Sequence, residues 1–486
     1  MEPCYRNRPT RRERLHGRSC PIPSRTGGQW PSGGGPRCYD PRVQETGDNG
    51  GSAHDSVEEP QRVSRPWWLP HFLGRVPIGL EERQVALVGV VALAALFENY
   101  DQSMLTAAFK QIREGFGLSQ AEAATWFGWI RLGALPAILV LPLADRLGRR
   151  IVILVGIVGM SLGTLASGFA PNIESFVAMQ TITRTFIVAA TATAVVIIAE
   201  ELPAANRGWG IGILGAVGAF GYGLGAILYA FIEYLPYGWR AMYMVGGVPL
   251  LLMPRFIRLI PETRRFVEER EERIAGRRPP SRWISPLAEL MRRYPGRILA
   301  VAGMAFFFAA GSSPAFGLLS DFVQTTHEWT PASFSLMSLV AGSFGIVGNS
   351  AMGWAADRWG RRPVASAGFG LFPLAALGLY FGPEATVALV WVPFVFLLTG
   401  GNVLMKIIIS EFFPTSSRNT AMGMGTLMET IGAAAGYWLV GGFTAVGTSI
   451  APAVVGVSAL CLFAVGVMFF IPETAGRELE ETSHAV

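Results

Sequence analysis

Charged side chains are scarce in this chain of 486 residues. Asp, Glu, Lys and Arg make up 15% of it, against about 25% in soluble domains, while hydrophobic residues make up 51%. The charges are also clustered, so that long stretches carry none. This composition excludes a soluble enzyme with a single anchor and predicts a protein that crosses the lipid bilayer many times.

Cysteine is rare as well. Three of the four cysteines lie near the N-terminus and Cys461 lies in an apolar segment, which predicts free thiols and no disulfide framework. The sequence shows no cluster of metal ligands, no Ser–His–Asp arrangement and no phosphate-binding Gly loop with a Lys. We therefore expect no metal, no cofactor and no enzyme activity, and ATP-driven transport is disfavoured.

Methionine is absent between Met1 and Met104. Residues 1–66 are rich in Arg, Pro, Gly and Ser, which predicts a disordered cytoplasmic tail without a secretory signal. A translation start at another codon near Val63 or Val76 is an alternative, in which the tail is not part of the protein. Residues 67–70 (Trp-Trp-Leu-Pro) predict an interfacial anchor before the first membrane span.

What the chain does contain is a repeat. Three motifs occur twice, in the same order and at offsets of 212, 211 and 211 residues. The repeated residues are Asp145, Arg146, Gly148, Arg149 and Arg150 with Asp357, Arg358, Gly360, Arg361 and Arg362; Glu200 and Arg207 with Glu411 and Arg418; and Glu262 with Glu473. A duplicated apolar half of many helices is the plan of a transporter built from two parallel repeats.

Twelve apolar segments, each near the length of about 20 residues that crosses a bilayer, predict an all-α membrane protein. They are 84–107, 121–143, 151–171, 174–198, 209–231, 241–260, 298–320, 332–355, 363–381, 386–409, 419–445 and 451–471. We expect a six-helix bundle at 67–261, a cytoplasmic linker with a short surface helix at 262–297, a second six-helix bundle at 298–475 and a tail at 476–486.

The arginines indicate orientation. The net charge of +5 does not point to nucleic acid, because the basic residues lie in the N-terminal tail and in alternate loops. Only Lys110 and Arg113, after the first span, and Arg240, after the fifth, depart from that alternation. This distribution predicts a multi-pass protein of the plasma or inner membrane with both termini in the cytoplasm.

With these motifs, residues 84–476 resemble the major facilitator superfamily. The Asp-Arg-x-Gly-Arg-Arg loops are similar to its signature, whose preceding Gly is present as Gly353 and replaced by Leu141 in the first copy. The Glu-x-x-Pro segments and residues 472–477 resemble the sugar-porter and metabolite–proton symporter branch. Span seven reads Phe-Phe-Phe-Ala-Ala-Gly-Ser-Ser-Pro at 306–314 and lacks the Gln-rich motif that binds sugar hydroxyls, so we do not expect a hexose.

The repeated motifs combine acidic and basic residues. Asp145 and Asp357 can pair with arginines at the ends of neighbouring helices, and the repeated glutamates supply further partners. Such a network, intact in one conformation and broken in the other, predicts a cytoplasmic gate formed by the residues of the three repeated motifs. The alternative is that the positive loops only fix the orientation.

Six ionisable residues interrupt the apolar segments: Glu98, Asp101, Arg131, Arg184, Lys406 and Glu429. Glu98 and Asp101 share a helix face, and two neighbouring carboxylates in a low dielectric cannot both ionise cheaply, so one is expected to carry a proton. Tyr100-Asp101 resembles the Tyr-Asp of sugar–proton symporters, and Arg184 resembles the span-four partner of that Asp. Gln180 occupies the expected level of this partner, one turn (about 5.4 Å) from Arg184. The alternatives are a hydrated Asp101 at the end of its span and an Arg184 neutralised by a structural partner.

The remaining charges predict a substrate cavity lined by Arg131, Gln180, Asn402, Lys406 and Glu429. Arg131 either extends to the membrane surface or faces the cavity and meets Glu98. Lys406, one of two lysines in the chain, either extends to the surface or pairs with Glu429. Three cations in the spans, Arg131, Arg184 and Lys406, favour an organic or aromatic acid as the substrate.

The predicted function is proton-coupled transport of a small polar metabolite by alternating access. Protonation of Asp101 or Glu98 would release Arg184 and permit the loaded carrier to reorient. Each chain contains both halves, so we expect it to act as a monomer. The alternatives are proton-driven efflux of amphipathic compounds, sugar uptake and a membrane sensor that does not transport.

Overall fold

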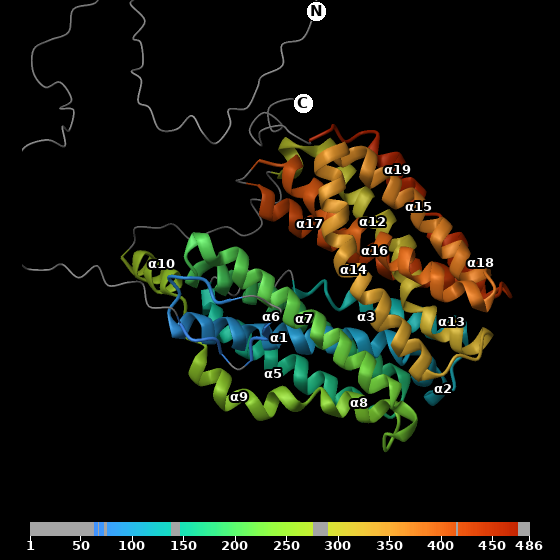
Figure 1. The fold of residues 1–486 in the computed structure, drawn as a ribbon, viewed down its shortest axis with the longest axis horizontal. Helices are drawn as coiled ribbons and strands as arrows, with labels where there is room; N and C mark the ends of the chain where they lie inside the picture. The colour runs from blue at the N-terminus through green and yellow to red at the C-terminus, as the bar shows by residue number, and fades with distance from the viewer. Residues whose placement is uncertain are drawn as a thin grey trace, which may run out of the picture. The chain divides into compact units, whose positions relative to one another are not determined.

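The computed structural model describes residues 63–66, 68–71, 75–137, 146–275, 290–414 and 417–474. Within these ranges the regular structure is helical throughout (Figure 1). Most of the expected tail at 1–66, the tail after 474, and Leu141 and Asp145 fall outside the described residues, so the expected pairing of Asp145 stays a prediction.

The N-terminal half comprises the elements from α1 to α9, which run from blue to green in Figure 1. They are α1 (Glu82–Ala107), α2 (Phe109–Gly115), α3 (Gln120–Leu132), α5 (Arg149–Gly168), α6 (Ile173–Glu201), η2 (Ala204–Asn206), α7 (Arg207–Ala230), η3 (Ile232–Tyr234), α8 (Trp239–Val245) and α9 (Val248–Leu259). The charged helix α10 (Arg264–Ile274) follows, as expected for the linker.

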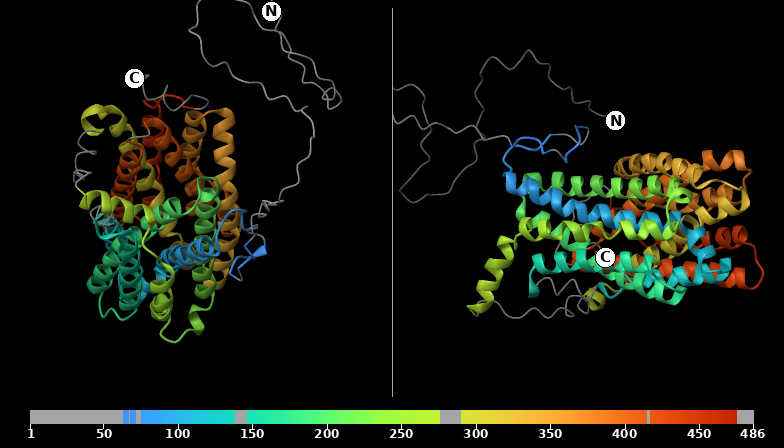
Figure 2. Two further views of the ribbon diagram at one scale, coloured as in Figure 1. Left: turned by 90° about the vertical axis from the view of Figure 1, so that its left-hand side faces the viewer. Right: turned by 90° about the horizontal axis from the view of Figure 1, so that it is seen from below.

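The C-terminal half is drawn from yellow to red (Figures 1 and 2). Its elements are α12 (Pro295–Gly317), α13 (Leu319–Thr326), α14 (Pro331–Trp359), α15 (Arg361–Phe381), α16 (Glu384–Phe412), α17 (Arg418–Ala445), α18 (Ile450–Ser458) and α19 (Cys461–Met468). Helix α12 begins at Pro295, inside the expected linker, because proline suits the first turn of a helix.

Ten helical stretches in the described ranges are long and apolar enough to span a membrane. Helices α3 and α17 stand where the second and eleventh spans were expected. The prediction of an all-α membrane protein with two six-helix repeats is confirmed. Two expected spans are each two helices in the structure: 241–260 forms α8 and α9, and 451–471 forms α18 and α19. The short helices α2 and α13 follow α1 and α12 after Ala108 and Leu318, at corresponding places of the two repeats.

Glycines set how closely the helices pack. In α7, Gly221 faces the backbone of Leu96 in α1, and in α17, Gly436 faces the backbone of Ala310 in α12. A Cβ atom at either glycine would collide with the facing carbonyl group, so the pairs α1–α7 and α12–α17 approach at backbone contact. These glycines therefore serve helix packing.

The segment before α1 packs on the N-terminal half. Val63 and Trp68 lie against the hydrophobic cluster of that half, and Leu69 is buried in it. The side chain of Trp68 lies against Gly89 of α1. These apolar side chains therefore contact the bundle, and the extent of the tail stays a prediction.

Candidate functional site in the centre and at the two ends of the bundles

The two ends of the bundles can be told apart by the repeated motifs. We call the end that carries Arg149, Glu200, Arg361 and Glu411 the motif side, and the opposite end the far side. Helix α1 begins on the motif side, because Gln84 donates a hydrogen bond to the Glu201 carbonyl at the end of α6 (2.8 Å). Helices α2 and α13 consequently lie on the far side, beyond the ends of α1 and α12.

On the motif side the first copy of the repeat forms one network. The Glu262 carboxylate accepts the backbone N–H groups of Arg149 (2.8 Å) and Arg150 (3.2 Å) at the start of α5. The Arg149 guanidinium pairs with Glu200 (3.2 Å), which also accepts the Thr263 hydroxyl (2.6 Å). The charge of Glu262 is thus stabilised by the N-terminus of α5, and the charge of Glu200 by the Arg149 guanidinium.

The second copy repeats these contacts residue for residue. Glu473 accepts the backbone N–H groups of Arg361 (2.7 Å) and Arg362 (3.0 Å). Arg361 pairs with Glu411 (3.0 Å), and Thr474 donates to the same carboxylate (2.6 Å). Arg361 also pairs with Asp357 one turn earlier (2.6 Å). Sequence repetition therefore reflects a repeated three-dimensional contact.

The glycine of each motif is required by its backbone. Gly148 and Gly360 have φ values of 103° and 101° and precede α5 and α15. A Cβ atom at either position would meet the carboxylate of Glu262 or Glu473. Only glycine combines this backbone conformation with the close approach of the glutamate.

Other residues of the expected gate lie around these networks. Arg207 donates to the Leu202 carbonyl (3.2 Å), and Arg150 donates to the Ile257 carbonyl (2.8 Å). Arg146 is exposed, and Arg358 lies 6.0 Å from the centre of the Trp354 ring. Each of these contacts lies within one half, so the described motif residues stabilise each bundle, and their role as a gate stays a prediction.

The far side joins the two halves. Asp321 of α13 is fully buried and accepts hydrogen bonds from Arg113 of α2 (2.9 Å) and from Gln120 of α3 (2.8 Å). Arg113 and Asp321 also form an ion pair of low exposure. We call Arg113, Gln120 and Asp321 the latch, since it links the halves through a desolvated charge.

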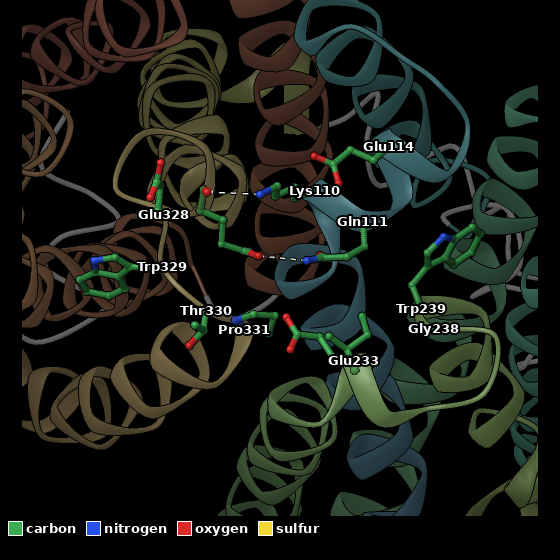
Figure 3. A pocket seen from close by; sticks show the side chains of 12 residues that line it. Lys110, Gln111, Glu114, Glu233, Gly238, Trp239, Glu328, Trp329, Thr330 and Pro331 are labelled. Atoms are coloured by element: carbon green, nitrogen blue, oxygen red, sulfur yellow. Dashed lines mark hydrogen bonds between the residues drawn. The ribbon is translucent and has the colours of Figure 1, made fainter.

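A second set of far-side contacts surrounds Gln324. Its side chain accepts from Gln111 (2.9 Å) and donates to the Tyr229 hydroxyl (2.7 Å), and its carbonyl accepts from Lys110 (3.2 Å). Beside them lies a pocket of about 530 Å³ between the halves, whose walls include Trp239 and Trp329 (Figure 3). The far side is therefore closed by hydrogen bonds across the interface.

Sequence reasoning missed these far-side residues. The predicted span ended at residue 320, just before Asp321 and Gln324, and their partners in α2 and α3 are more than 200 positions away. One signal was present: Lys110 and Arg113 departed from the charge pattern of the loops. The contacts that these two residues make with the other half explain that departure.

In the centre, Asp101 of α1 is turned into the N-terminal half. It is 2% exposed, and its Oδ1 accepts the hydroxyl of Thr164 in α5 (2.9 Å). Gln180 of α6 lies beside this carboxylate, is fully buried and donates to Ser167 (3.1 Å). Gln180 therefore packs behind Asp101 in this conformation and has no surface with which to line a cavity.

Arg184 lies close to Asp101 without a direct hydrogen bond. Its charge acts on both Asp101 and Glu98, whereas its Nη1 donates to Gln102. Its Nε and Nη2 have no hydrogen-bond partner among the described residues. Asp101 and Arg184, the expected pair, thus lie within electrostatic range, but the guanidinium of Arg184 forms its hydrogen bond with Gln102.

Glu98, the other carboxylate of α1, accepts the hydroxyl of Thr191 in α6. The charges of Arg184, Asp101 and Lys406 all act on it. Lys406 belongs to α16 of the C-terminal half, so the two halves contribute opposite charges to one central region.

The remaining central charges face each other across the interface. Arg131 of α3 lies 5.6 Å from the centre of the Tyr437 ring in α17, and its charge acts on Glu429. Lys406 also acts on Glu429, yet these described side chains form no ion pair within 4.0 Å. Arg131 is thus directed to the C-terminal half and not to Glu98, while the amide of Asn402 donates to Leu398 of its own helix (2.9 Å).

Two repeated six-helix halves that meet around a charged centre define a secondary membrane transporter. The Major Facilitator Superfamily family model matches residues 91–318 and 300–485, so the chain belongs to that family and is a transporter, not an enzyme. It is 27% identical to the gallate transporter of Pseudomonas putida over 387 residues, 72% of this chain and 83% of that one.

Further relatives agree with this assignment. The 4-hydroxybenzoate transporter PcaK of Acinetobacter baylyi is 26% identical over 331 residues, 61% of this chain and 71% of that one. The inward open structure of the xylose transporter XylE from E. coli has a TM-score of 0.65 and 17% identity, and the match covers 82% of this chain and 99% of that one. At that identity the structural likeness concerns the fold alone.

Proposed function

We propose that this protein takes up an aromatic carboxylic acid together with a proton. The observation that carries the proposal is the group of Arg131, Arg184 and Lys406, which three helices of both halves contribute to one central region. Cations inside a membrane protein are costly unless they meet negative charge, and an organic anion can supply it. The relatives named for gallate and 4-hydroxybenzoate carry such anions.

Lys406 is the residue best placed to bind the carboxylate. Its side chain is exposed within the described structure, although it belongs to a membrane-spanning helix. It also acts on carboxylates of both halves, Glu98 and Glu429. A substrate anion bound there would replace these carboxylates, with Asn402 one turn before Lys406 on α16 and Arg131 contributed by the other half.

Asp101 is proposed as the proton carrier, with Glu98 as its neighbour. In this conformation a buried carboxylate faces an arginine that lacks a direct hydrogen bond to it. Protonation of Asp101 removes the charge that holds Arg184 nearby, so Arg184 becomes available to the substrate anion. Binding of the proton therefore favours binding of the anion, and this couples the two movements.

The motif side is proposed to face the cytoplasm of a bacterial-type plasma or inner membrane, with both termini on that side, because the repeated arginines lie there. The repeated networks then lie at the cytoplasmic gate, where each holds the helix ends of its own half together, and the latch and the Gln324 contacts close the outside. A single chain contains both halves and suffices as a monomer.

Uptake by cells that express the protein tests the proposal. Labelled gallate and 4-hydroxybenzoate, a hexose and an amphipathic cation are added at several external pH values, and external pH is recorded. We expect accumulation of an aromatic acid with alkalinisation outside, faster at low pH. Asp101→Asn should abolish the pH dependence, and Arg184→Gln should abolish uptake.

Three results would contradict parts of this scheme. Uptake of the acid without proton movement removes Asp101 from coupling. Survival of uptake in Arg184→Gln with unchanged pH dependence removes Arg184 from the mechanism. Lower accumulation than in control cells indicates efflux, and ligand binding without any flux indicates a sensor.

A further inference from the structure

A small cavity lies directly behind Asp101, on the side away from the interface between the halves. It is formed by residues of α1, α5 and α6 and by the α8–α9 junction, with a volume of about 10 Å³. Its lining residues are Phe97, Asp101, Met160, Ser161, Thr164, Ile187 and Gly246. This is about the smallest space that holds one water molecule.

Two polar atoms at this cavity have no hydrogen-bond partner among the described residues. They are Asp101 Oδ2 and Ser161 Oγ, on side chains that are 2% and 1% exposed. The other walls, from Phe97, Met160 and Ile187, are apolar. A buried carboxylate oxygen and a buried hydroxyl that both go unpaired are costly, whereas a shared water molecule would satisfy both.

We propose that this cavity holds one water molecule bridging Asp101 Oδ2 and Ser161 Oγ, and that Ser161 is a positioning residue for the proton site. The inference rests on the proposed role of Asp101 as proton carrier. When Asp101 is ionised, the water donates to Oδ2 and accepts from Ser161. When Asp101 is protonated, the carboxyl O–H donates to the water, which donates to Ser161.

Water and serine suit this position because each can donate or accept a hydrogen bond. A group such as a lysine, which only donates, would favour one protonation state. Oδ1 is already bound by Thr164, a hydroxyl with the same double capacity. Both oxygens of Asp101 would therefore have hydrogen-bond partners in the protonated and in the ionised form of the carboxyl group.

The ionisable groups around Asp101 are on three elements. Glu98 and Tyr100 lie on α1 itself, Arg184 approaches from α6, and Tyr243 approaches from α8. Helix α5, which carries Ser161, contributes no ionisable group to the cavity: its lining residues are Met160 and the hydroxyl residues Ser161 and Thr164. A change at residue 161 can thus alter the hydrogen bonding of the carboxyl group without adding or removing a charge.

The test is infrared titration of the purified full-length protein, without substrate. The carboxylic acid band assigned to Asp101 is the band that disappears in Asp101→Asn. In Ser161→Ala we expect the pH at which this band is half lost to rise by about one unit, since the ionised form loses more than the neutral form. Ser161→Cys, with nearly the same volume and a weak donor, should give an intermediate shift.

Ser458→Ala is the matched control. Ser458 is a fully buried serine of the other half, and its hydroxyl donates to Val455 of its own helix (2.7 Å). Its substitution should leave the Asp101 band unchanged. Size-exclusion elution and helix content establish that each variant is folded, and Ser161→Cys provides the readout if Ser161→Ala does not fold.

The outcomes separate this inference from the proposed function. An unchanged midpoint in Ser161→Ala and Ser161→Cys overturns the role of Ser161, even if aromatic acids are carried with protons. A shifted midpoint supports it, even if the substrate proves to be another compound. Absence of any Asp101 band between about pH 4 and 9 overturns both the proton carrier and the bridge. A midpoint that depends on sodium at constant ionic strength indicates a metal ion in the cavity and also overturns the inference.

Discussion

The latch on the far side gives the sharpest prediction, because it is a buried ion pair between the two halves. Asp321→Asn removes its negative charge and leaves Arg113 facing a neutral amide. Truncating one partner of such a pair costs about 2 to 5 kcal/mol. We expect the low end of this range, since Arg113 keeps the Leu118 carbonyl (3.3 Å) and the exposed Glu114 (3.4 Å).

This cost falls only on the conformation in which the far side is closed. A loss of about 2 kcal/mol multiplies the ratio of far-side-open to far-side-closed molecules by about thirty. The ratio can be measured by pulsed electron paramagnetic resonance between spin labels on opposite halves. Tyr234→Cys and Val446→Cys suit the labels, as their side chains are 83% and 81% exposed.

The labels require the tail cysteines to be replaced by serine, while Cys461 is buried and can stay. Wild-type protein should give mainly the short-distance population, and Asp321→Asn should gain a long-distance one. Glu384→Gln is the control, because the Glu384 carboxylate accepts a hydrogen bond from the indole N–H of Trp329 within its own half (3.1 Å). The double variant Arg113→Met with Asp321→Leu should restore the short distance, since an apolar pair leaves no buried charge. An unchanged distribution in Asp321→Asn would refute the latch.

Two further predictions concern the motif side and the centre. Gly148→Ala and Gly360→Ala should each destabilise the protein by about 1 to 3 kcal/mol, which lowers the midpoint of thermal unfolding in detergent. Gly353→Ala is the control and should leave that midpoint unchanged, because a Cβ atom there meets nothing within 4 Å. Lys406→Gln should raise the KM for an aromatic carboxylate about tenfold or more and leave its pH dependence intact; an unchanged KM would exclude Lys406 from binding.

The sequence allowed the fold and the motif networks to be predicted for a physical reason. Each motif lies within a few residues of a helix end, and the order of the helices brings those ends to one side. Repetition then indicated that Glu262 and Glu473 have the same role, and the structure shows the same backbone contacts for both. The local pattern and the repeat were therefore sufficient to predict the motif networks.

The centre and the far side could be predicted only in part. The sequence identified Asp101 and Arg184 as charges within a span, but the direction of their side chains depends on packing. In the structure Asp101 accepts a hydrogen bond from Thr164, and Arg184 donates one to Gln102. The latch joins residues from different halves, so neither spacing nor periodicity could link Arg113 to Asp321. Contacts between repeats carry no periodic signal along the chain.

The positions of these networks suggest how the halves can move as units. The motif networks tie the ends of α5, α6 and the segment after α9 together in one half, and their counterparts do so in the other. Those contacts persist when the halves rotate, because both partners belong to the same body. The latch and the Gln324 contacts join different bodies, so they must break when the far side opens. The contacts that reorientation must break therefore lie at the interface, where Lys406, Arg131 and Arg184 of the proposed substrate and proton sites also lie. To drive such a transporter almost completely from one conformation to the other, its ligands must bind the second conformation about 10⁴-fold more tightly than the first.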